Sequence, residues 1–356
     1  MPKFSILCPS FNHEQYVGFF IESVLKQEFR DFELIIVDDC SKDNNVKKIQ
    51  QYNDTRIKLI CHSFNQGINA SLNTAFKHSS GEIIIFCASD DMFEQNALNE
   101  YNKYFQDKKN NIIVPSLTLI DIQNQVLTKQ SHQPIKMSRE KLLNHLFLKG
   151  NCLTSPGLSM RRDIFERVLY PLPLCICNQQ DTQMHIKLLL QYEYTILDEK
   201  LVKYRLDIQN PSISAQNNPL TKIRENLETQ MIMDTFLQCK DLKLLKQIFS
   251  AENSQEYIEI FEDDISFFLG KMALLSPHLE RRIWGYHKIM KAYDTNAQAL
   301  HERYNFTFKS MLDLALFCKE DDTYIKKYKK YKKFFKISLI FFGILLILFI
   351  ILEVLR

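Results

Sequence analysis

Two adjacent aspartates at the end of a short apolar run constrain this chain most. Asp90 and Asp91 close the run Glu82-Ile-Ile-Ile-Phe-Cys-Ala-Ser-Asp-Asp, and an apolar run of this length predicts a strand buried on both faces. Like charges side by side repel each other, so a fold that keeps them at a strand end usually sets a cation or a polyol between them. The pair predicts a site for a metal ion and a phosphate group, and a plain turn is the alternative.

Two other apolar runs end in polar residues in the same way. Residues 33–37 lead into Asp38 and Asp39, and residues 4–7 lead into Cys8-Pro-Ser-Phe-Asn. Helical spacing of apolar residues is found between the runs, over residues 17–25 and 68–76. Alternating strands and helices predict an α/β fold with a mainly parallel sheet, in which ligands bind beyond the carboxyl ends of the strands. The polar residues at the three strand ends are expected to converge on one crevice, unless Asp38 and Asp39 only terminate their strand.

Four segments together resemble the family 2 glycosyltransferases, nucleotide-sugar enzymes with the GT-A fold. They are residues 4–12 with Pro-Ser-Phe-Asn, 32–43 with Val-Asp-Asp-Cys-Ser-Lys-Asp, Asn65 to Asn73, and 81–91. They occur in the family's order and spacing, and the resemblance covers residues 1–210. It implies a catalytic domain with a Rossmann-like mixed sheet, and transfer of a sugar from a nucleotide diphosphate donor.

The resemblance implies roles for several residues in a nucleotide pocket. The turn from Pro9 to Phe11 is expected to lie against the base, and Glu14 to close its edge. Asp39 matches the aspartate that accepts a hydrogen bond from the base, which is uracil in many members. Asn65-Gln-Gly has two equally favoured interpretations. One is a contact with the ligand, and the other is an ordinary turn in which Gly67 has a positive φ.

The same resemblance implies a metal site. It places Asp90 near the ribose and makes Asp91 the more direct ligand of Mg²⁺ or Mn²⁺, a hard cation that would neutralise the charge developing on a diphosphate leaving group. The chain departs from the family at Ala88, where members often have a further Asp, and at Leu72, where they commonly have an arginine.

The acceptor side is expected around Asp181. The stretches Ser155-Pro-Gly-Leu-Ser-Met-Arg-Arg and Leu201-Val-Lys-Tyr-Arg resemble acceptor-side segments of the family, and Gln180-Asp181 stands where members have a Glu-Asp pair at a helix start. In inverting transferases one carboxylate deprotonates the acceptor hydroxyl as it attacks the anomeric carbon, which makes Asp181 the candidate catalytic base. A helix N-cap is its alternative role.

Beyond residue 210, apolar residues at helical intervals predict a helical extension over 221–325, as a packing appendix or a partner-binding element. The nine cysteines are not spaced like those of a disulfide-bonded framework. The spacing of Cys175-x-Cys177 does not match that of a zinc-binding pair. Unbonded thiols and an intracellular catalytic region are expected. The first strand starts directly after Met1-Pro-Lys, so no N-terminal signal segment is expected.

The C-terminal residues predict a single membrane anchor. Sixteen uncharged residues, Ile337 to Leu352, reach about 24 Å as a helix, and Phe334 and Phe335 extend this toward the roughly 30 Å of a hydrocarbon core. We expect an anchor over 337–355 and a polybasic juxtamembrane segment over 326–336, although a solvated charge run before a core helix is the alternative. The positive-inside rule keeps such lysines cytoplasmic, and anionic lipids attract them.

The basic excess of the chain is local to that segment. Without its seven lysines the chain has 38 basic residues against 42 acidic ones, which excludes a general nucleic-acid-binding surface. The family resemblance together with the predicted anchor implies a glycosyltransferase of the bacterial inner membrane. It is expected to move a hexose or N-acetylhexosamine from a UDP-linked donor to a glycan or lipid-linked acceptor in surface polysaccharide synthesis.

Two other functions stay open on the sequence. A sugar nucleotidyltransferase would also need a metal and a nucleotide pocket, but it normally has a Gly-rich phosphate loop, and residues 8–19 contain only Gly18. A catalytically silent membrane scaffold with the same fold is favoured by Leu72 and Gln180.

Overall fold

The computed structural model describes residues 1–128, 135–206, 218–253 and 259–319. The chain divides into two compact units, Met1–Phe306 and Thr307–Arg356. The described part of the second unit contains the helix α13 (Phe308–Leu314) and the 3₁₀ turn η4 (Ala315–Cys318), and a capping box between Thr307 and Ser310 starts α13. The elements that follow belong to the first unit.

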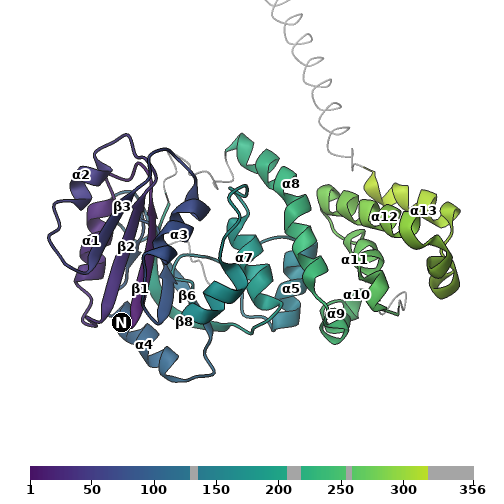
Figure 1. Ribbon diagram of the computed structural model, residues 1–356, viewed down its shortest axis with the longest axis horizontal. Coiled ribbons are helices and arrows are strands. Elements are labelled where there is room, and N and C mark those ends of the chain that lie inside the picture. The colour runs from purple at the N-terminus through teal and green to yellow at the C-terminus, as the bar shows by residue number, and fades with distance from the viewer. Residues whose placement is uncertain (129–134, 207–217, 254–258, 320–356) are drawn as a thin grey trace, which may run out of the picture. The chain divides into compact units, whose positions relative to one another are not determined.

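The first unit contains an eight-stranded mixed sheet in the order β3-β2-β1-β4-β7-β6-β8-β5 (Figure 1). Its strands are β1 (Phe4–Ser10), β2 (Phe32–Asp38), β3 (Ile57–Cys61), β4 (Ile83–Phe86), β5 (Met92–Phe93), β6 (Ile112–Ile120), β7 (Ser159–Arg161) and β8 (Thr195–Arg205). β3, β2, β1 and β4 are parallel neighbours, whereas β7 is antiparallel to β4 and β6, and β5 is antiparallel to β8. The expected α/β class and mixed sheet are confirmed.

The helices of the first unit are α1 (Val17–Leu25), α2 (Asn45–Ile49), α3 (Ile68–Lys77), α4 (Ala97–Gln106), α5 (Arg139–Leu148), α6 (Arg162–Ile164), η1 (Phe165–Leu169), α7 (Gln180–Leu189), α8 (Pro219–Asp234), η2 (Thr235–Gln238), α9 (Leu242–Ile248), α10 (Ser250–Asn253), η3 (Glu262–Asp264), α11 (Ile265–Ala273) and α12 (Leu279–Tyr304). α1 and α3 occupy the two stretches whose apolar spacing predicts helices.

Helices pack on both faces of the parallel strands, because successive strand residues point to opposite sides. In β1, Ile6 and Cys8 belong to a core that includes residues of α1 and α4, whereas Leu7 belongs to a core that includes residues of α3. All seven residues of β1 and of β2 are buried, as their continuous apolar runs predict. With both faces covered, the strand ends are left to bind a ligand.

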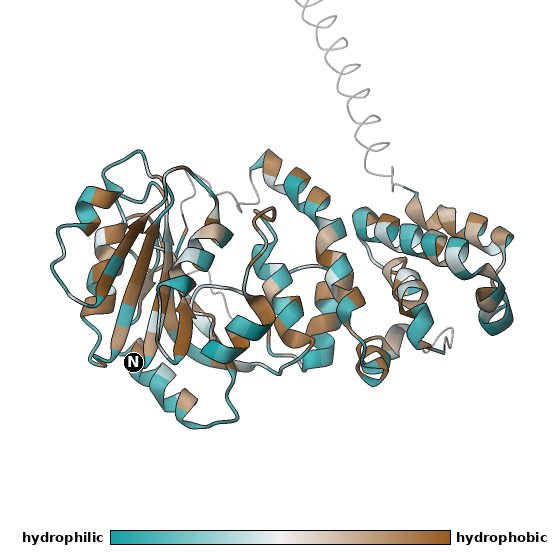
Figure 2. Ribbon diagram, in the orientation of Figure 1, coloured by the Kyte–Doolittle hydropathy of each residue, from teal (hydrophilic) through white to brown (hydrophobic). Residues whose placement is uncertain are grey.

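A separate apolar core joins α5 and α7 to the helices that follow residue 218. Phe147 of α5 lies at its centre, with ring centroids 4.9 Å from Phe236, 4.8 Å from Phe249 and 6.0 Å from Trp284. In Figure 2 the brown, hydrophobic segments of these helices accordingly gather where the helices meet. The expected helical C-terminal region is therefore confirmed for the residues that the structure describes.

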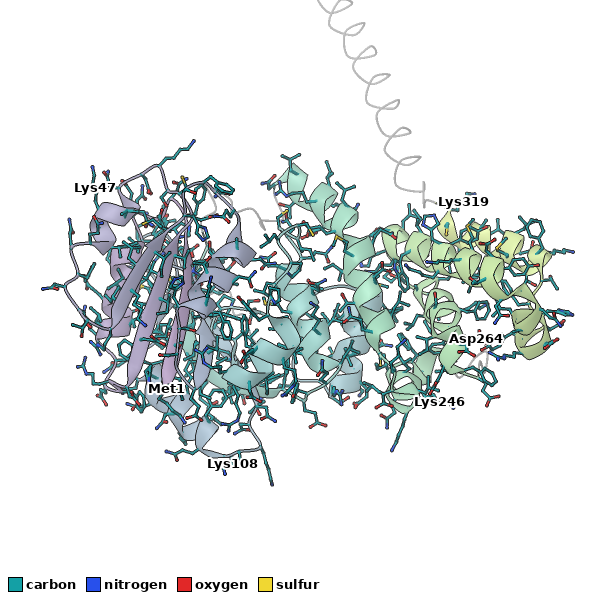
Figure 3. The ribbon with its side chains drawn as sticks, in the orientation of Figure 1. Met1, Lys47, Lys108, Lys246, Asp264 and Lys319 are labelled. Carbon is teal, nitrogen blue, oxygen red and sulfur yellow. The ribbon has the colours of Figure 1, made fainter. Side chains whose placement is uncertain are left out.

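Two glycines allow α11 and α12 to cross closely. A Cβ atom added to Gly285 would lie 2.5 Å from the carbonyl oxygen of Gly270, and one added to Gly270 would lie 2.8 Å from that of Gly285. Near the far end of α12, the buried carboxylate of Asp264, labelled in Figure 3, accepts hydrogen bonds from Arg303 over 2.5 Å and from the Tyr304 hydroxyl over 3.2 Å. Close backbone contact at the two glycines, and the ion pair from Arg303 to Asp264 at the N-cap of α11, thus hold the two helices together.

Within the described ranges, no helix has the length and apolar character that crossing a membrane requires. The polybasic segment predicted over 326–336 and the anchor predicted over 337–355 lie outside those ranges. Both stay predictions from the sequence.

Candidate active site

The carboxyl ends of β2, β1 and β4 lie side by side, because these strands are parallel neighbours. The amide of Asp39, just after β2, donates to the Ser10 carbonyl over 2.9 Å, and the amide of Ser89, after β4, donates to the Pro9 carbonyl over 3.3 Å. The segments that carry Asp39 and Asp90 are therefore both bound to the end of β1. The three strand ends thus lie together as expected, and that they line one crevice stays a prediction.

The residues predicted to contact the nucleotide base follow this edge of the sheet. Pro9 is buried within β1, whereas Phe11, just beyond the strand, is 38% exposed. Glu14 connects two loops: its Oε2 accepts from the amide of Asn44 over 2.6 Å, and its own amide donates to Asp43 Oδ2 over 2.9 Å. The hydrogen bond from Asn44 lowers the pKa of Glu14 below its usual value, so this loop contact is made by an ionised carboxylate.

Asp39 holds the turn that begins α3. Its Oδ1 accepts from the amide of Gln66 over 2.8 Å and its Oδ2 from the amide of Gly67 over 2.7 Å, and His62 Nδ1 lies 2.7 Å from Oδ1. Gly67 has a φ of 87°, which glycine adopts without steric cost, as the turn alternative expects. A carboxylate has about four acceptor positions, so these contacts leave room for one further donor.

Asp90 and Asp91 have different surroundings. Asp91 is only 1% exposed, and its Oδ1 accepts from the amide of Arg205 over 3.0 Å. Burial, followed by the charge of Asp90, raises the pKa of Asp91 well above its usual range. The side chain of Asp90 is 30% exposed, and its Oδ2 lies 3.8 Å from Nε2 of His13. Of the two carboxylates, Asp90 is therefore the one that a ligand can reach from solvent.

Arg205, at the end of β8, fixes the segment that carries both aspartates. Its guanidinium donates to the carbonyls of Asp90 and Asp121, each over 2.7 Å, and to Asn124 Oδ1 over 2.6 Å. The same guanidinium lies 4.5 Å from the ring centroid of Tyr16. One buried cation thus connects β8, the loop after β4, the loop after β6 and the start of α1.

A metal ion at this edge would need ligands from the substrate as well as from the protein. The described residues include no group of three or more His, Cys, Asp and Glu side chains that could hold a metal ion. One accessible carboxylate nevertheless fits Mg²⁺, which is commonly bound by one or two carboxylates together with phosphate oxygens and water.

A hydrogen-bond chain that the sequence did not indicate runs along the same edge. His13 Nδ1 lies 2.8 Å from Ser89 Oγ, which donates to Ser10 Oγ over 2.7 Å. Ser10 Oγ also accepts from Asn45 Nδ2 over 2.8 Å, and the same amide group donates to Asp38 Oδ1 over 2.8 Å. The only signal for His13 was its position in the loop between Phe11 and Glu14.

Asp181 lies in the first turn of α7, whose N-cap is Gln179. Its Oδ1 accepts from the amide of Thr182 over 2.7 Å and its Oδ2 from Asn151 Nδ2 over 2.9 Å. Burial raises the pKa of Asp181 to about 6, although these hydrogen bonds oppose the shift. A general base is most effective with a pKa near the working pH. The surroundings of Asp181 therefore suit proton abstraction, and Gln179 rather than Asp181 occupies the N-cap.

Tyr204 relates Asp181 to the strand-end carboxylates. Burial is the largest cause of the raised pKa of Tyr204, and the charges of Asp91, Asp90 and Asp181 raise it further. All three carboxylates thus lie within electrostatic reach of one hydroxyl group beside Arg205.

Glu228 of α8 orders the segment that leads to Asp181. The sequence did not indicate this role of Glu228. Its Oε1 accepts from the Cys177 amide over 3.0 Å, and its Oε2 accepts from the amides of Asn178 over 3.0 Å and Gln179 over 2.8 Å. The Cys177 thiol also donates to Oε1 over 2.9 Å. A carboxylate at these amides complements the N-terminus of α7. Figure 1 shows α8 beside α7.

Of the departures from the family pattern, Leu72 has a local explanation and Gln180 has none. Leu72 is 3% exposed and packs in the core formed by β1, β2 and α3. Oε1 of Gln180 is buried and accepts no hydrogen bond within the described part of the chain. Cys175 and Cys177 are free thiols, as expected.

Comparisons with known proteins identify relatives of this chain. The model of the family described as Glycosyl transferase family 2 matches residues 5–169. The Escherichia coli protein WfgD, a UDP-Glc:alpha-D-GlcNAc-diphosphoundecaprenol beta-1,3-glucosyltransferase, is 30% identical over 205 residues, which are 57% of this chain and 76% of that protein. The Campylobacter jejuni GalNAc(5)-diNAcBac-PP-undecaprenol beta-1,3-glucosyltransferase is 35% identical over 102 residues, which are 28% of this chain and 33% of that protein.

A solved structure shares the fold over most of the chain. The crystal structure of Staphylococcus aureus TarS in complex with UDP-GlcNAc matches with a TM-score of 0.55 and 17% identity, over 84% of this chain and 92% of that chain. At this identity the likeness concerns the fold alone.

Proposed function

The chain belongs to glycosyltransferase family 2, and from this membership we propose that it transfers a hexose or N-acetylhexosamine from a UDP-linked donor to a lipid-linked glycan acceptor. The observation that supports the proposal is that the segments carrying Asp39 and Asp90 are both bound to the end of β1, and that Asp90 and Asp181 both contribute to the raised pKa of Tyr204. Relatives named for UDP-Glc and for diphosphoundecaprenol acceptors support the donor and the acceptor class.

The nucleotide is proposed to bind at the end of β1. Phe11 is exposed enough to contact a base. The side chain of Asp39 is only 5% exposed, but it has an acceptor position left, so the imide N–H of uracil would reach it as the base covers this turn. Pro9 and Glu14 would shape this pocket indirectly, because Pro9 is buried and Glu14 holds the loop at Asn44.

The sequence resemblance favoured Asp91 as the metal ligand. We assign the cation contact to Asp90 instead. Asp90 is solvent-accessible, whereas Asp91 is buried and bonded to the Arg205 amide. When bound, Mg²⁺ or Mn²⁺ would supply positive charge for the diphosphate leaving group. In this arrangement Asp91 and Arg205 position the loop that carries Asp90.

Asp181 is proposed to act as the base. Its carboxylate takes the proton from the acceptor hydroxyl as the hydroxyl oxygen attacks the anomeric carbon, and the bond from that carbon to the UDP oxygen breaks with its electron pair leaving on UDP. A single displacement of this kind inverts the anomeric centre. The pKa of about 6 keeps Asp181 ionised at neutral pH while it stays basic enough to accept a proton.

The predicted anchor over 337–355 would hold the enzyme at the bacterial inner membrane, with the catalytic residues in the cytoplasm, where nucleotide sugars are made. Anionic lipids would then be partners of the lysines in 326–336. A tethered enzyme meets a membrane-held acceptor at a raised effective concentration.

The purified full-length protein tests this function against both alternatives. We expect it to release UDP from at least one of UDP-glucose, UDP-galactose, UDP-GlcNAc and UDP-GalNAc in Mn²⁺, and to stop in excess chelator. Formation of a nucleotide sugar from UTP and a sugar phosphate would instead identify a nucleotidyltransferase. Failure to bind or turn over any donor would favour the silent scaffold.

A further inference from the structure

The N-terminal part of α8 has the reverse polarity of an ordinary surface helix. The side chains that face the molecule there are polar, with Thr221, Glu228 and Thr229 exposed by only 1%, 8% and 3%. The outer side carries large apolar side chains that are 44% to 73% exposed: Leu220, Ile223, Leu227 and Met231. A helix of a globular protein normally turns its apolar side to the core. These four residues, here called the α8 stripe, therefore mark a surface that binds something apolar.

The α8 stripe is continuous along the helix. Its members follow one another at intervals of three, four and four residues, which places them on one side of an α-helix. Brown segments recur along α8 in Figure 2. Glu228, on the inner side of α8, accepts hydrogen bonds from the Cys177, Asn178 and Gln179 amides. Rotation of the helix to bury the stripe would break these bonds.

The α8 stripe borders the segment that carries the proposed base. Met231 Sδ lies 3.9 Å from the Cys175 thiol, and the neighbouring Leu174 is 63% exposed. From Cys177 the same segment runs through the amides bound by Glu228 to Asp181. The apolar surface thus begins beside the acceptor side of the site.

We propose that the α8 stripe rests in the surface of the lipid bilayer that holds the acceptor, so that the lipid chain of the acceptor stays in the bilayer while its glycan reaches Asp181. This inference rests on the lipid-linked acceptor of the proposed function. An interfacial helix places its apolar side at the boundary of headgroups and acyl chains, and basic residues beside that side favour anionic lipid. α8 itself has Lys222 and Arg224 against Glu225, Glu228 and Asp234, so its contact with lipid would depend on the apolar stripe, and the basic residues would come from the lysines of 326–336.

Two features of the chain favour a bilayer over a second copy of the protein. The sequence after residue 319 includes seven lysines followed by sixteen uncharged, mostly apolar residues, a composition suited to a lipid surface. The stripe itself has four side chains, whereas a stable protein interface has roughly 20–30 residues on each side.

Tryptophan fluorescence of the full-length protein tests the contact directly. Trp284 is the only tryptophan of the chain and is fully buried, so it supplies a constant background. Leu227→Trp puts a reporter in the α8 stripe, and Asn226→Trp puts a matched reporter at the adjacent exposed position outside it. With phosphatidylcholine and phosphatidylglycerol vesicles that have brominated acyl chains, we expect a blue shift and loss of emission for Leu227→Trp, and a clearly smaller change for Asn226→Trp.

Catalytic assays separate this inference from the proposed function. The double variant Ile223→Gln, Leu227→Gln should raise the KM for an acceptor embedded in vesicles by about tenfold. Its kcat and KM for a water-soluble acceptor analogue should match wild type, as should those of the control Asn226→Gln. If the wild-type protein turned over no UDP-sugar, the proposed function would fail, while selective quenching of Leu227→Trp would still support the lipid contact.

Two results would overturn the inference. Equal quenching at positions 226 and 227 would show that the stripe does not enter lipid. A dimer of the wild-type protein in detergent that the double variant converts to a monomer would show that a second copy covers the stripe instead.

Discussion

Asp90 and Asp91 are neighbours in the chain, but Asp90 is accessible to solvent and Asp91 is buried. Substituting one or the other should therefore have different effects on metal binding. Asp90→Asn is expected to lower Mn²⁺-dependent donor turnover by about 100-fold or more, because it removes the carboxylate that a cation can reach. Asp91→Asn keeps an oxygen for the Arg205 amide and removes a charge that burial disfavours, so metal affinity should persist. Manganese titrations of both variants decide between them. Loss of affinity in Asp91→Asn alone would return the metal contact to Asp91.

Asp181 gives a prediction with a distinct pH signature. Asp181→Asn should lower transfer by about 100-fold or more while donor affinity stays near normal. In the wild type, kcat/KM should rise as the pH rises through about 6, because only the ionised carboxylate accepts a proton. Asn keeps an oxygen that can accept from the Thr182 amide, so a nearly silent substitution and a flat pH profile would indicate a structural role.

The raised pKa of Asp181 also affects the stability of the fold. Stability should change with pH in the opposite direction to kcat/KM. The pKa of Asp181 in the folded protein is above its ordinary value of 3.8, so protonation favours the native state. The contribution of this group to the free energy of unfolding therefore decreases as the pH rises from about 4 to about 6.

The site residues found from the sequence are those that belong to a recognisable motif. Asp39, Asp90 and Asp181 stand in short segments with a family pattern. His13 and Glu228 have no such pattern, and their contacts join positions 76 residues apart in one case and about 50 in the other. Contacts of this range depend on how the elements pack, which local sequence does not encode.

At the scale of elements, α8 is expected to control the acceptor side through Glu228. Glu228→Gln keeps the size of the side chain but presents an N–H group to backbone amides that need an acceptor. The free energy of unfolding should fall by about 2 kcal/mol, because hydrogen bonds to a buried carboxylate are lost. For transfer, kcat should fall while the KM for the donor is unchanged. Normal kcat in a destabilised variant would limit Glu228 to a packing role.

The crossing of α11 and α12 gives a second prediction at this scale. Gly285→Ala should lower the free energy of unfolding by about 1–3 kcal/mol, because the new Cβ would lie 2.5 Å from the Gly270 carbonyl oxygen. Gly18→Ala in α1 is a matched control, since its nearest neighbour is the Tyr52 hydroxyl at 3.3 Å, the far end of a flexible side chain. Denaturant unfolding compares the two, and equal effects would argue against the close crossing.

Of the four parallel neighbours β3, β2, β1 and β4, the strands β1, β2 and β4 were predictable, whereas β3 and the antiparallel strands β5 and β7 were not. β1, β2 and β4 are continuous apolar runs whose burial on both faces shows in the sequence. β7 and β5 have only three and two residues, and their antiparallel partners are distant in the chain. The exposed pattern of α8 was also missed, because helical spacing of apolar residues does not say which side of a helix faces the core.

At the scale of the whole molecule, the C-terminal residues are expected to set location rather than chemistry. Deleting residues 326–356 should leave only the weaker contact of the α8 stripe with the membrane, so that a high-salt wash releases the protein. Transfer to a soluble acceptor analogue should persist, because the proposed site residues all precede residue 206. Transfer to a membrane-held acceptor should fall as the effective concentration falls. If the truncated protein stayed in the membrane pellet after a high-salt wash, the α8 stripe would be the next surface to test.

The anomeric configuration of the product tests the central claim most directly. UDP-glucose and its relatives in the donor panel have α-linked sugars, and one displacement assisted by Asp181 gives a β-linked product. Proton NMR of the product formed from the preferred donor and a soluble acceptor analogue reads this configuration from the anomeric coupling constant. The account predicts a β linkage, and an α linkage would contradict direct displacement by an acceptor that Asp181 deprotonates.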